Sequence, residues 1–304
     1  MKIAKSGNLA RGGARRAARA AAIVAVALCC STVSAFEWPF GAFKPTSLFG
    51  QRADGVIGRG ITLEGQEVVR ASGHGTTLVT IAKNGNMTGF PSTLGNFAVL
   101  SHEDGLLSAY GNLEALDRVD GRTQIDSGTI LGIAGSSAWG KPKDVFFQVI
   151  DTKRKTVLNP LLVLPGFKDT RGPVISNVLA ISGNNQPFAL GSVKFVKQGK
   201  YRVYADVTDS IDGVAGEFAP FRISVLVNGK EYASIPFEML QEDSGKLYLS
   251  SKDSREYTWA ALYGDPTRMF LADVPLTRGR ADISIIACDI AGNERSVLFG
   301  VQVE

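Results

Sequence analysis

The stretch that decides the fold is GNFAVLSHEDGLLSAYGNL, which runs from Gly95 to Leu113. It holds two apolar runs, Phe97–Leu100 and Leu106–Tyr110, on either side of a polar segment. Short apolar runs between glycine and Asn/Asp punctuation are typical of strands in a β-sandwich or barrel. This stretch therefore predicts two strands of an all-β domain.

The same pattern continues on both sides of this stretch. Further apolar or alternating runs occur at residues 67–71, 77–81, 129–133, 145–150, 201–207, 221–227, 257–263 and 281–288. Asn228-Gly229 is a hairpin turn signal, and the proline- and glycine-rich residues 160–173 indicate a boundary. We predict an N-terminal arm at residues 36–55, a β domain at 56–164, a linker at 165–173 and an immunoglobulin-like β-sandwich at 174–304.

The first 35 residues indicate export. They combine a basic start, the apolar run from Ala20 to Cys30 and the small-residue pattern Val33-Ser34-Ala35, as in a secretory signal peptide. We therefore expect an exported protein of the periplasm or cell envelope of a bacterium. A lipid anchor at Cys29 or Cys30 is an alternative, and no other apolar run is long enough to predict a transmembrane segment in the mature chain.

Composition and charge exclude some partners. The chain has 304 residues, of which 44% are hydrophobic and 20% are charged, enough for a sizeable core. Its formal charge of +4 comes from the first 35 residues, because the rest holds 27 Lys and Arg against 29 Asp and Glu. No basic cluster remains after that segment, so a nucleic-acid partner is not expected.

Several blocks of the first half, taken in order, resemble one family. They are residues 67–75, the stretch 95–113, residues 125–135, the run 145–149 and Asn159-Pro160. Their order and spacing are similar to those of lysostaphin-type, LytM-like zinc peptidases of bacterial cell walls. The resemblance implies that residues 56–164 form the antiparallel β-sheet fold of that family, the duplicated hybrid motif.

The family's metal-binding motifs fall on other residue types in this chain. Its H-x-x-x-D motif falls on residues 58–62, its tyrosine-x-histidine-leucine motif on 110–113 and its H-x-H motif on 144–146. The degenerate positions are therefore Gly58, Thr62, Asn112, Asp144 and Phe146. A catalytic zinc site needs three protein ligands and an open position for water. The resemblance thus implies the fold without the metal site, and we predict no catalytic residue and no cofactor.

The histidine count supports this interpretation. The chain has only two histidines, His74 and His102, whereas the family site uses at least three. We expect His74 to be exposed and His102 to be a turn histidine that is hydrogen-bonded near Glu103 or Asp104. A new metal site that combines His102 with Asp104 or Asp144 is the alternative. A turn is also the simplest interpretation of residues 289–294, with a calcium site at Asp289 as its alternative.

These features favour a non-catalytic LytM-like envelope protein that binds peptidoglycan or regulates a cell-wall hydrolase. We expect Asn112, Trp139, Asp144 and Gln148 along the remnant cleft. One alternative is an active zinc-dependent peptidoglycan endopeptidase, and only that alternative requires zinc. Another is a structural or adhesive envelope protein, in which aromatic residues of the segment 36–49 form a contact patch; the competing interpretation is an arm packed on its own domain.

Overall fold

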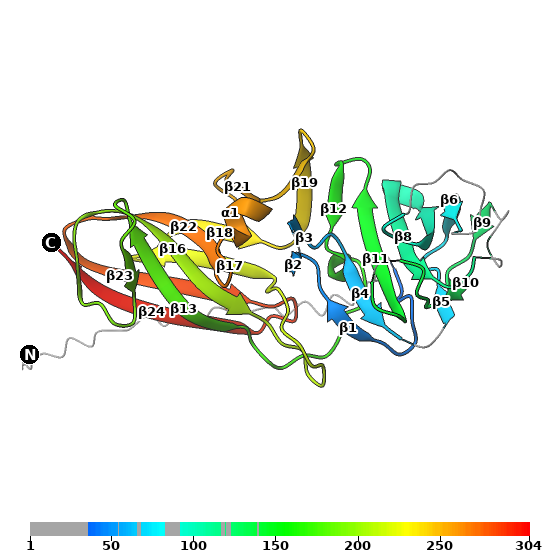
Figure 1. Cartoon of the computed structure of the whole chain (residues 1–304), viewed down its shortest axis with the longest axis horizontal. Coiled ribbons are helices and arrows are strands. Elements are labelled where there is room, and N and C mark those ends of the chain that lie inside the picture. Colours follow the sequence, from blue (N-terminus) through cyan, green and yellow to red (C-terminus); the bar gives the residue numbers. More distant parts are fainter. Residues whose placement is uncertain are drawn as a thin grey trace, which may run out of the picture. The chain divides into compact units, whose positions relative to one another are not determined.

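The computed structural model describes residues 36–304, except 54, 66–67, 83–91, 117–118, 120–122 and 139. Within this part of the chain, nearly all regular structure is β-strand (Figure 1). The all-β class predicted from the sequence is therefore confirmed. The predicted signal peptide lies outside the described residues.

The largest sheet is built around β11 (Asp144–Asp151), which pairs antiparallel with β8 (Leu106–Leu113) on one edge. On its other edge β11 pairs with β4 (Ile61–Glu64) and β12 (Thr156–Leu158). The remaining strands of this sheet are β1 (Lys44–Ser47), β6 (Gly75–Ile81), β7 (Asn96–Ser101), β9 (Gln124–Ile125), β19 (Met239–Asp243), β20 (Lys246–Ser250) and β21 (Glu256–Thr258).

Two-residue alternation explains why these segments are strands with one face in the core. Along β11, Val145, Phe147 and Val149 are fully buried, while the residues between them are more exposed. Successive side chains of a strand point to opposite faces, so this pattern fixes which face packs inward. The Phe147 ring lies 5.2 Å from that of buried Tyr110. One face of β11 is therefore free to line a site.

Short elements complete this region. β5 (Val68–Arg70) pairs with β10 (Ile130–Ile133), and β2 (Arg52–Ala53) pairs with β3 (Val56–Ile57). Two 3-10 helices lie at Glu103–Gly105 and Pro160–Leu162.

Two further sheets enclose a second hydrophobic core. The first contains β14 (Pro187–Ala189), β13 (Val174–Ser182), β16 (Gly199–Thr208) and β22 (Met269–Leu276), in that order. The second contains β15 (Phe195–Val196), β24 (Glu294–Val303), β23 (Gly279–Cys288), β17 (Arg222–Val227) and β18 (Lys230–Pro236). Buried residues of both sheets share one core, which is the arrangement of a β-sandwich. Its assignment as immunoglobulin-like, and the predicted domain boundaries, stay predictions.

The hairpin predicted at Asn228-Gly229 is confirmed. These two residues join β17 to β18, and both have positive φ angles, 50° and 79°. Positive φ at both central positions is the requirement of a tight type I′ turn, which Asn-Gly meets well.

One predicted strand is wrong. Residues 257–263 were expected to be a strand of the sandwich, but β21 ends at Thr258 and α1 (Trp259–Tyr263) follows. The Thr258 hydroxyl accepts a hydrogen bond from the Ala261 amide at 3.3 Å and so caps the helix. Residues 259–263 include two alanines and a leucine and no β-branched residue, a composition that favours helix.

The local sequence pattern also did not predict which strands β19, β20 and β21 pair with. β19 pairs with β12, with Leu240 opposite Val157, so residues 239–258 extend the sheet built around β11.

The aromatic segment 36–49 packs inside the protein: Phe36 and Phe40 join the core beside β11, and Phe49 joins the sandwich core, so the contact-patch interpretation is wrong. Phe36, Phe40 and Phe49 are almost fully buried. Trp38 stacks on Phe43 with ring centroids 4.3 Å apart, and its indole donates a hydrogen bond to the Pro165 carbonyl. The segment therefore contributes to the hydrophobic cores.

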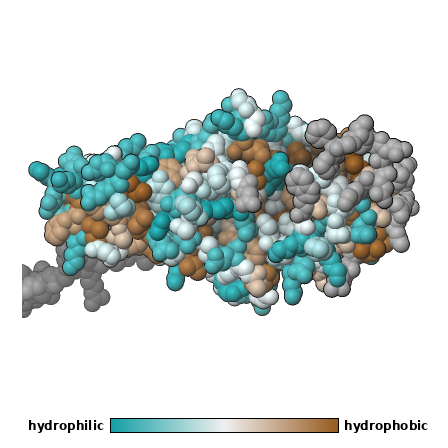
Figure 2. Space-filling model, viewed as in Figure 1, coloured by the Kyte–Doolittle hydropathy of each residue, from teal (hydrophilic) through white to brown (hydrophobic). Residues whose placement is uncertain are grey.

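No helix in the described part of the chain has the length and hydrophobicity that crossing a membrane requires. On the face drawn in Figure 2, hydrophobic areas are interrupted by hydrophilic ones.

Candidate functional site

A cavity of about 300 Å³ lies against the face of β11 that carries Asp144 and Phe146. The structure brings together in its lining all five positions that the sequence analysis aligned with the family motifs: Gly58, Thr62, Asn112, Asp144 and Phe146. These positions come from three separate segments of the chain, residues 58–62, 110–113 and 144–146. The cavity is therefore the candidate site.

Strand pairing sets the positions of these residues. Thr62 on β4 lies opposite Phe146 on β11, and Phe146 lies opposite Gly111 on β8, next to Asn112. Asp144, Phe146 and Gln148 alternate with core residues and so share one face of β11. Gln148 is half-buried on this face but does not line the cavity. Trp139 lies outside the described residues.

The Asn112 side chain holds the loop that follows β10. Its Nδ2 donates to the carbonyl oxygens of Gly135, Lys141 and Asp144, at 3.2, 3.1 and 2.6 Å. Its Oδ1 accepts a hydrogen bond from the Ala138 amide at 2.8 Å. Asn112 is buried and has a positive φ of 64°, which asparagine adopts more readily than most residues. Its polar atoms are therefore used within the protein.

Asp144 is the carboxylate of the cavity. It is buried, and burial raises the pKa of its carboxyl above the usual value. A hydrogen bond from the Thr46 hydroxyl, 3.4 Å from Oδ2, lowers this pKa, while the neighbouring Glu64 carboxylate raises it.

Sequence reasoning missed other residues of the cavity wall. Arg59 is an exposed cation at its edge, and Ser47 and Thr93 bring hydroxyl groups. Arg59 falls inside the segment matched to the H-x-x-x-D motif, but the motif assigns it no role. Ser47 and Thr93 are distant in sequence from every motif, so no local signal could have identified them.

The residues present do not fit a catalytic zinc ion. Gly58 has no side chain, Phe146 is apolar and the polar atoms of Asn112 are already hydrogen-bonded. Among the described residues that line the cavity, Asp144 is the one side chain of a usual zinc-ligand type. Three protein ligands are needed to hold a catalytic zinc.

His102 lies at another site and is not bonded as predicted. Its Nδ1 is 2.7 Å from the His74 carbonyl oxygen, and its Nε2 is 2.6 Å from Ser108 Oγ, so the contact expected near Glu103 or Asp104 is wrong. Ser108 Oγ also lies 3.0 Å from Tyr110 Oη. Ser108 is fully buried, so this serine–histidine pair cannot reach a substrate and is part of the core.

His74 is exposed as expected and pairs with Asp126 at 3.1 Å.

His102 should make folding stability depend on pH. Burial lowers its pKa below the ordinary value of 6.5. The unfolded state therefore binds more protons than the folded state as the pH falls through 6.5, and the free energy of unfolding decreases. In urea unfolding between pH 7.5 and 5, we expect a steeper loss for the wild type than for His102→Gln. Equal pH slopes for the two proteins would contradict this prediction.

Known proteins similar to this chain were found by sequence and by structure. A protein-family model that carries no descriptive name matches residues 172–304. An uncharacterized protein of Treponema pallidum (strain Nichols) is 38% identical over 124 residues, which cover 37% of this chain and 84% of that protein. The chain belongs to the same family as this Treponema pallidum protein. Because that relative is uncharacterized, membership in the family assigns no activity.

Solved structures give more distant likenesses. The catalytic domain of a mutant of the prophage-encoded M23 protein EnpA from Enterococcus faecalis is 23% identical, with a TM-score of 0.35, over 41% of this chain and 95% of that chain. Lysostaphin is 15% identical, with a TM-score of 0.33, over 77% of this chain and 95% of that chain. Likenesses at these TM-scores are too distant to assign a function.

Proposed function

We propose that this chain is an exported, non-catalytic LytM-like protein whose cavity binds peptidoglycan. One observation carries the proposal: the five degenerate motif positions meet in one cavity of about 300 Å³, whose side chains do not fit zinc. This volume is at the lower end of the range for small-ligand pockets. A site of this kind binds a ligand without transforming it.

The lining of the cavity suits a peptide or sugar of the cell wall. Val56, Ile57 and Phe146 give apolar contact surface, and Thr62 brings a hydroxyl that can bond to an amide or a sugar. The exposed Arg59 guanidinium can pair with a peptide carboxylate in bidentate geometry. The signal-like first 35 residues support export to the compartment that contains this polymer.

Co-sedimentation of the purified chain with peptidoglycan sacculi tests the proposal. Gly140→Trp should fill the cavity, because a Cβ at this exposed glycine meets only Asn112 Nδ2, at 3.9 Å. We expect Gly140→Trp and Arg59→Ala each to weaken binding about tenfold, which corresponds to about 1.4 kcal/mol. Arg295→Ala removes a cation from β24 that is also exposed and should leave binding unchanged.

Two results would overturn the proposal. One is a protein that does not sediment with sacculi; binding to a purified cell-wall hydrolase in the same preparation would then favour a regulatory role. The other is one tightly held zinc per chain together with release of soluble muropeptides, which would favour the endopeptidase alternative.

A further inference from the structure

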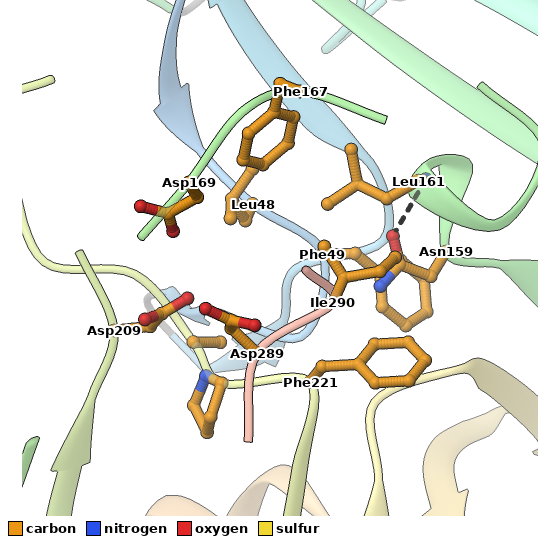
Figure 3. Close-up of a pocket in the computed structure, with 12 residues that line it drawn as sticks. Leu48, Phe49, Asn159, Leu161, Phe167, Asp169, Asp209, Phe221, Asp289 and Ile290 are labelled. Carbon is orange, nitrogen blue, oxygen red and sulfur yellow. Dashed lines mark hydrogen bonds between the residues drawn. The ribbon is translucent and has the colours of Figure 1, made fainter. Parts of the chain in front are cut away.

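Three aspartates that are distant in sequence meet outside the candidate cavity. Asp169 precedes β13, Asp209 directly follows β16 and Asp289 directly follows β23. One carboxylate oxygen from each lies within 4.8 Å of the other two. Figure 3 shows the three carboxylates grouped at one side of a small cavity. Asp209 and Asp289 are only 6% and 4% exposed.

Asp209 has an oxygen without a partner in this group. Its Oδ1 is buried and accepts no hydrogen bond. A buried carboxylate oxygen that lacks a partner is costly, because this oxygen has lost its water, although the carboxyl as a group still accepts a hydrogen bond from the Ser210 amide. This orphaned atom is independent of the clustering of charge and points to a ligand at this place.

The other two carboxylates are held in place by hydrogen bonds. Asp289 accepts from the Asn293 amide at 2.8 Å and from Asn293 Nδ2 at 2.7 Å. Asp169 Oδ1 accepts from the amides of Arg171 and Asp212, at 3.2 and 3.1 Å. Each carboxylate oxygen has two lone pairs, so these bonds orient the groups and leave capacity for a cation.

No side-chain cation in the described part of the chain lies within ion-pair distance of these three carboxylates. Arg171 is nearby, but its Nε pairs with Asp212 Oδ1 at 3.2 Å. Burial, together with the charges of Asp289 and Asp169, raises the pKa of Asp209 to about 7. A bound cation would neutralise this repulsion.

The size and chemistry of the site select the cation. The cavity has a volume of about 20 Å³, whereas a single water needs roughly 10–15 Å³ by the same kind of measure. Carboxylate oxygens prefer hard cations such as Ca²⁺ and Mg²⁺. Oxygens on opposite sides of Ca²⁺ are about 4.6–5.2 Å apart, and about 4.0–4.2 Å for Mg²⁺. Separations within 4.8 Å admit both ions. The cavity has little room for the several waters that Mg²⁺ usually keeps, and Ca²⁺ accepts irregular oxygen geometry, so the site favours Ca²⁺.

We propose that Asp169, Asp209 and Asp289 bind one calcium ion, which ties the segment before β13 to the ends of β16 and β23. The ion has a structural role. The proposal does not depend on the function of the cavity beside β11, because the two sites share no residue.

Calorimetric titration of the chelator-treated chain with CaCl₂ tests this proposal, with thermal unfolding as a second readout. We expect one ion per chain, and a Tm at least about 4 °C higher at a calcium concentration 100 times Kd. Asp209→Asn should weaken binding at least tenfold and remove the shift in Tm. Asp126→Asn removes a carboxylate whose side chain is 89% exposed at a remote place, and should leave both unchanged.

The stability of Asp209→Asn without calcium shows whether a loss of calcium binding comes from the lost ligand or from misfolding. Without calcium, Asp209→Asn should be at least as stable as the wild type, because the amide relieves like-charge repulsion; lost binding then cannot be attributed to misfolding. A folded wild type that binds no calcium at millimolar concentration would overturn the site, as would binding that Asp209→Asn leaves unchanged. Tighter binding of MgCl₂ than of CaCl₂ would overturn the assignment to calcium.

Discussion

Replacing Asn112 by alanine is expected to lower the free energy of unfolding by about 2–4 kcal/mol. The substitution removes the side-chain partner of the Ala138 amide and of the Asp144 carbonyl. The carbonyls of Gly135 and Lys141 lose a contact too, but they still accept hydrogen bonds from the amides of Lys143 and Asp144. Each buried polar group left unpaired costs about 1–3 kcal/mol, and water entering the loop recovers part of the sum. Urea unfolding of the two proteins measures the difference.

Asn185→Ala is the matched control for this prediction. Asn185 also has a left-handed backbone, with φ of 62°, but it is exposed and its side chain accepts one hydrogen bond, from Arg202. Its substitution measures the cost of alanine at positive φ, about 1 kcal/mol. If Asn112→Ala cost no more than Asn185→Ala, the side chain would not hold the loop.

The hydrogen bonds of Asn112 bear on how the site is interpreted. The family resemblance places this residue where a catalytic histidine would stand, and the remnant cleft was predicted to use it for ligand binding. In the structure its amide instead holds the loop that forms one wall of the cavity. A ligand contact of Asn112 stays a prediction, while its bonds within the protein explain why an amide occupies this position.

The sequence predicted what depends on local pattern. Alternation along residues 145–150 marked β11, and Asn228-Gly229 marked a turn, because both follow from a two-residue period or from φ preferences. Residues 257–263 alternate too, but the Thr258 cap and the helix formers after it outweighed that pattern. Short apolar runs often leave helix and strand unresolved.

The other site residues could not be predicted, because contacts between residues distant in the chain bring them together. Motif spacing brought five cavity positions together, whereas Ser47 and Thr93 join them only through the packing of the folded chain. Likewise, the sequence singled out Asp289 as an alternative calcium site. Asp169 and Asp209 lie 120 and 80 residues away from it in the chain, and only the ends of β16 and β23 bring them close.

Gly60→Ala should disrupt the junction of β4 and β11 and lower the free energy of unfolding by about 2–3 kcal/mol. A Cβ at Gly60 would overlap the Phe147 carbonyl oxygen and would lie 2.9 Å from the Phe146 ring. Backbone cannot yield as a flexible side chain can, so the strands must separate, and overpacking of this kind costs about 1–3 kcal/mol. Chemical denaturation gives the loss.

Gly166→Ala is the control, because no atom lies within 4 Å of the added Cβ and the residue is exposed. Its stability should stay within about 1 kcal/mol of the wild type and can rise, since alanine restricts the unfolded chain. Gly60→Ala should also weaken sedimentation with sacculi, because Phe146 lines the cavity. Unchanged stability of Gly60→Ala would mean that β4 does not approach β11 so closely. Loss of stability with unchanged binding would place the ligand elsewhere.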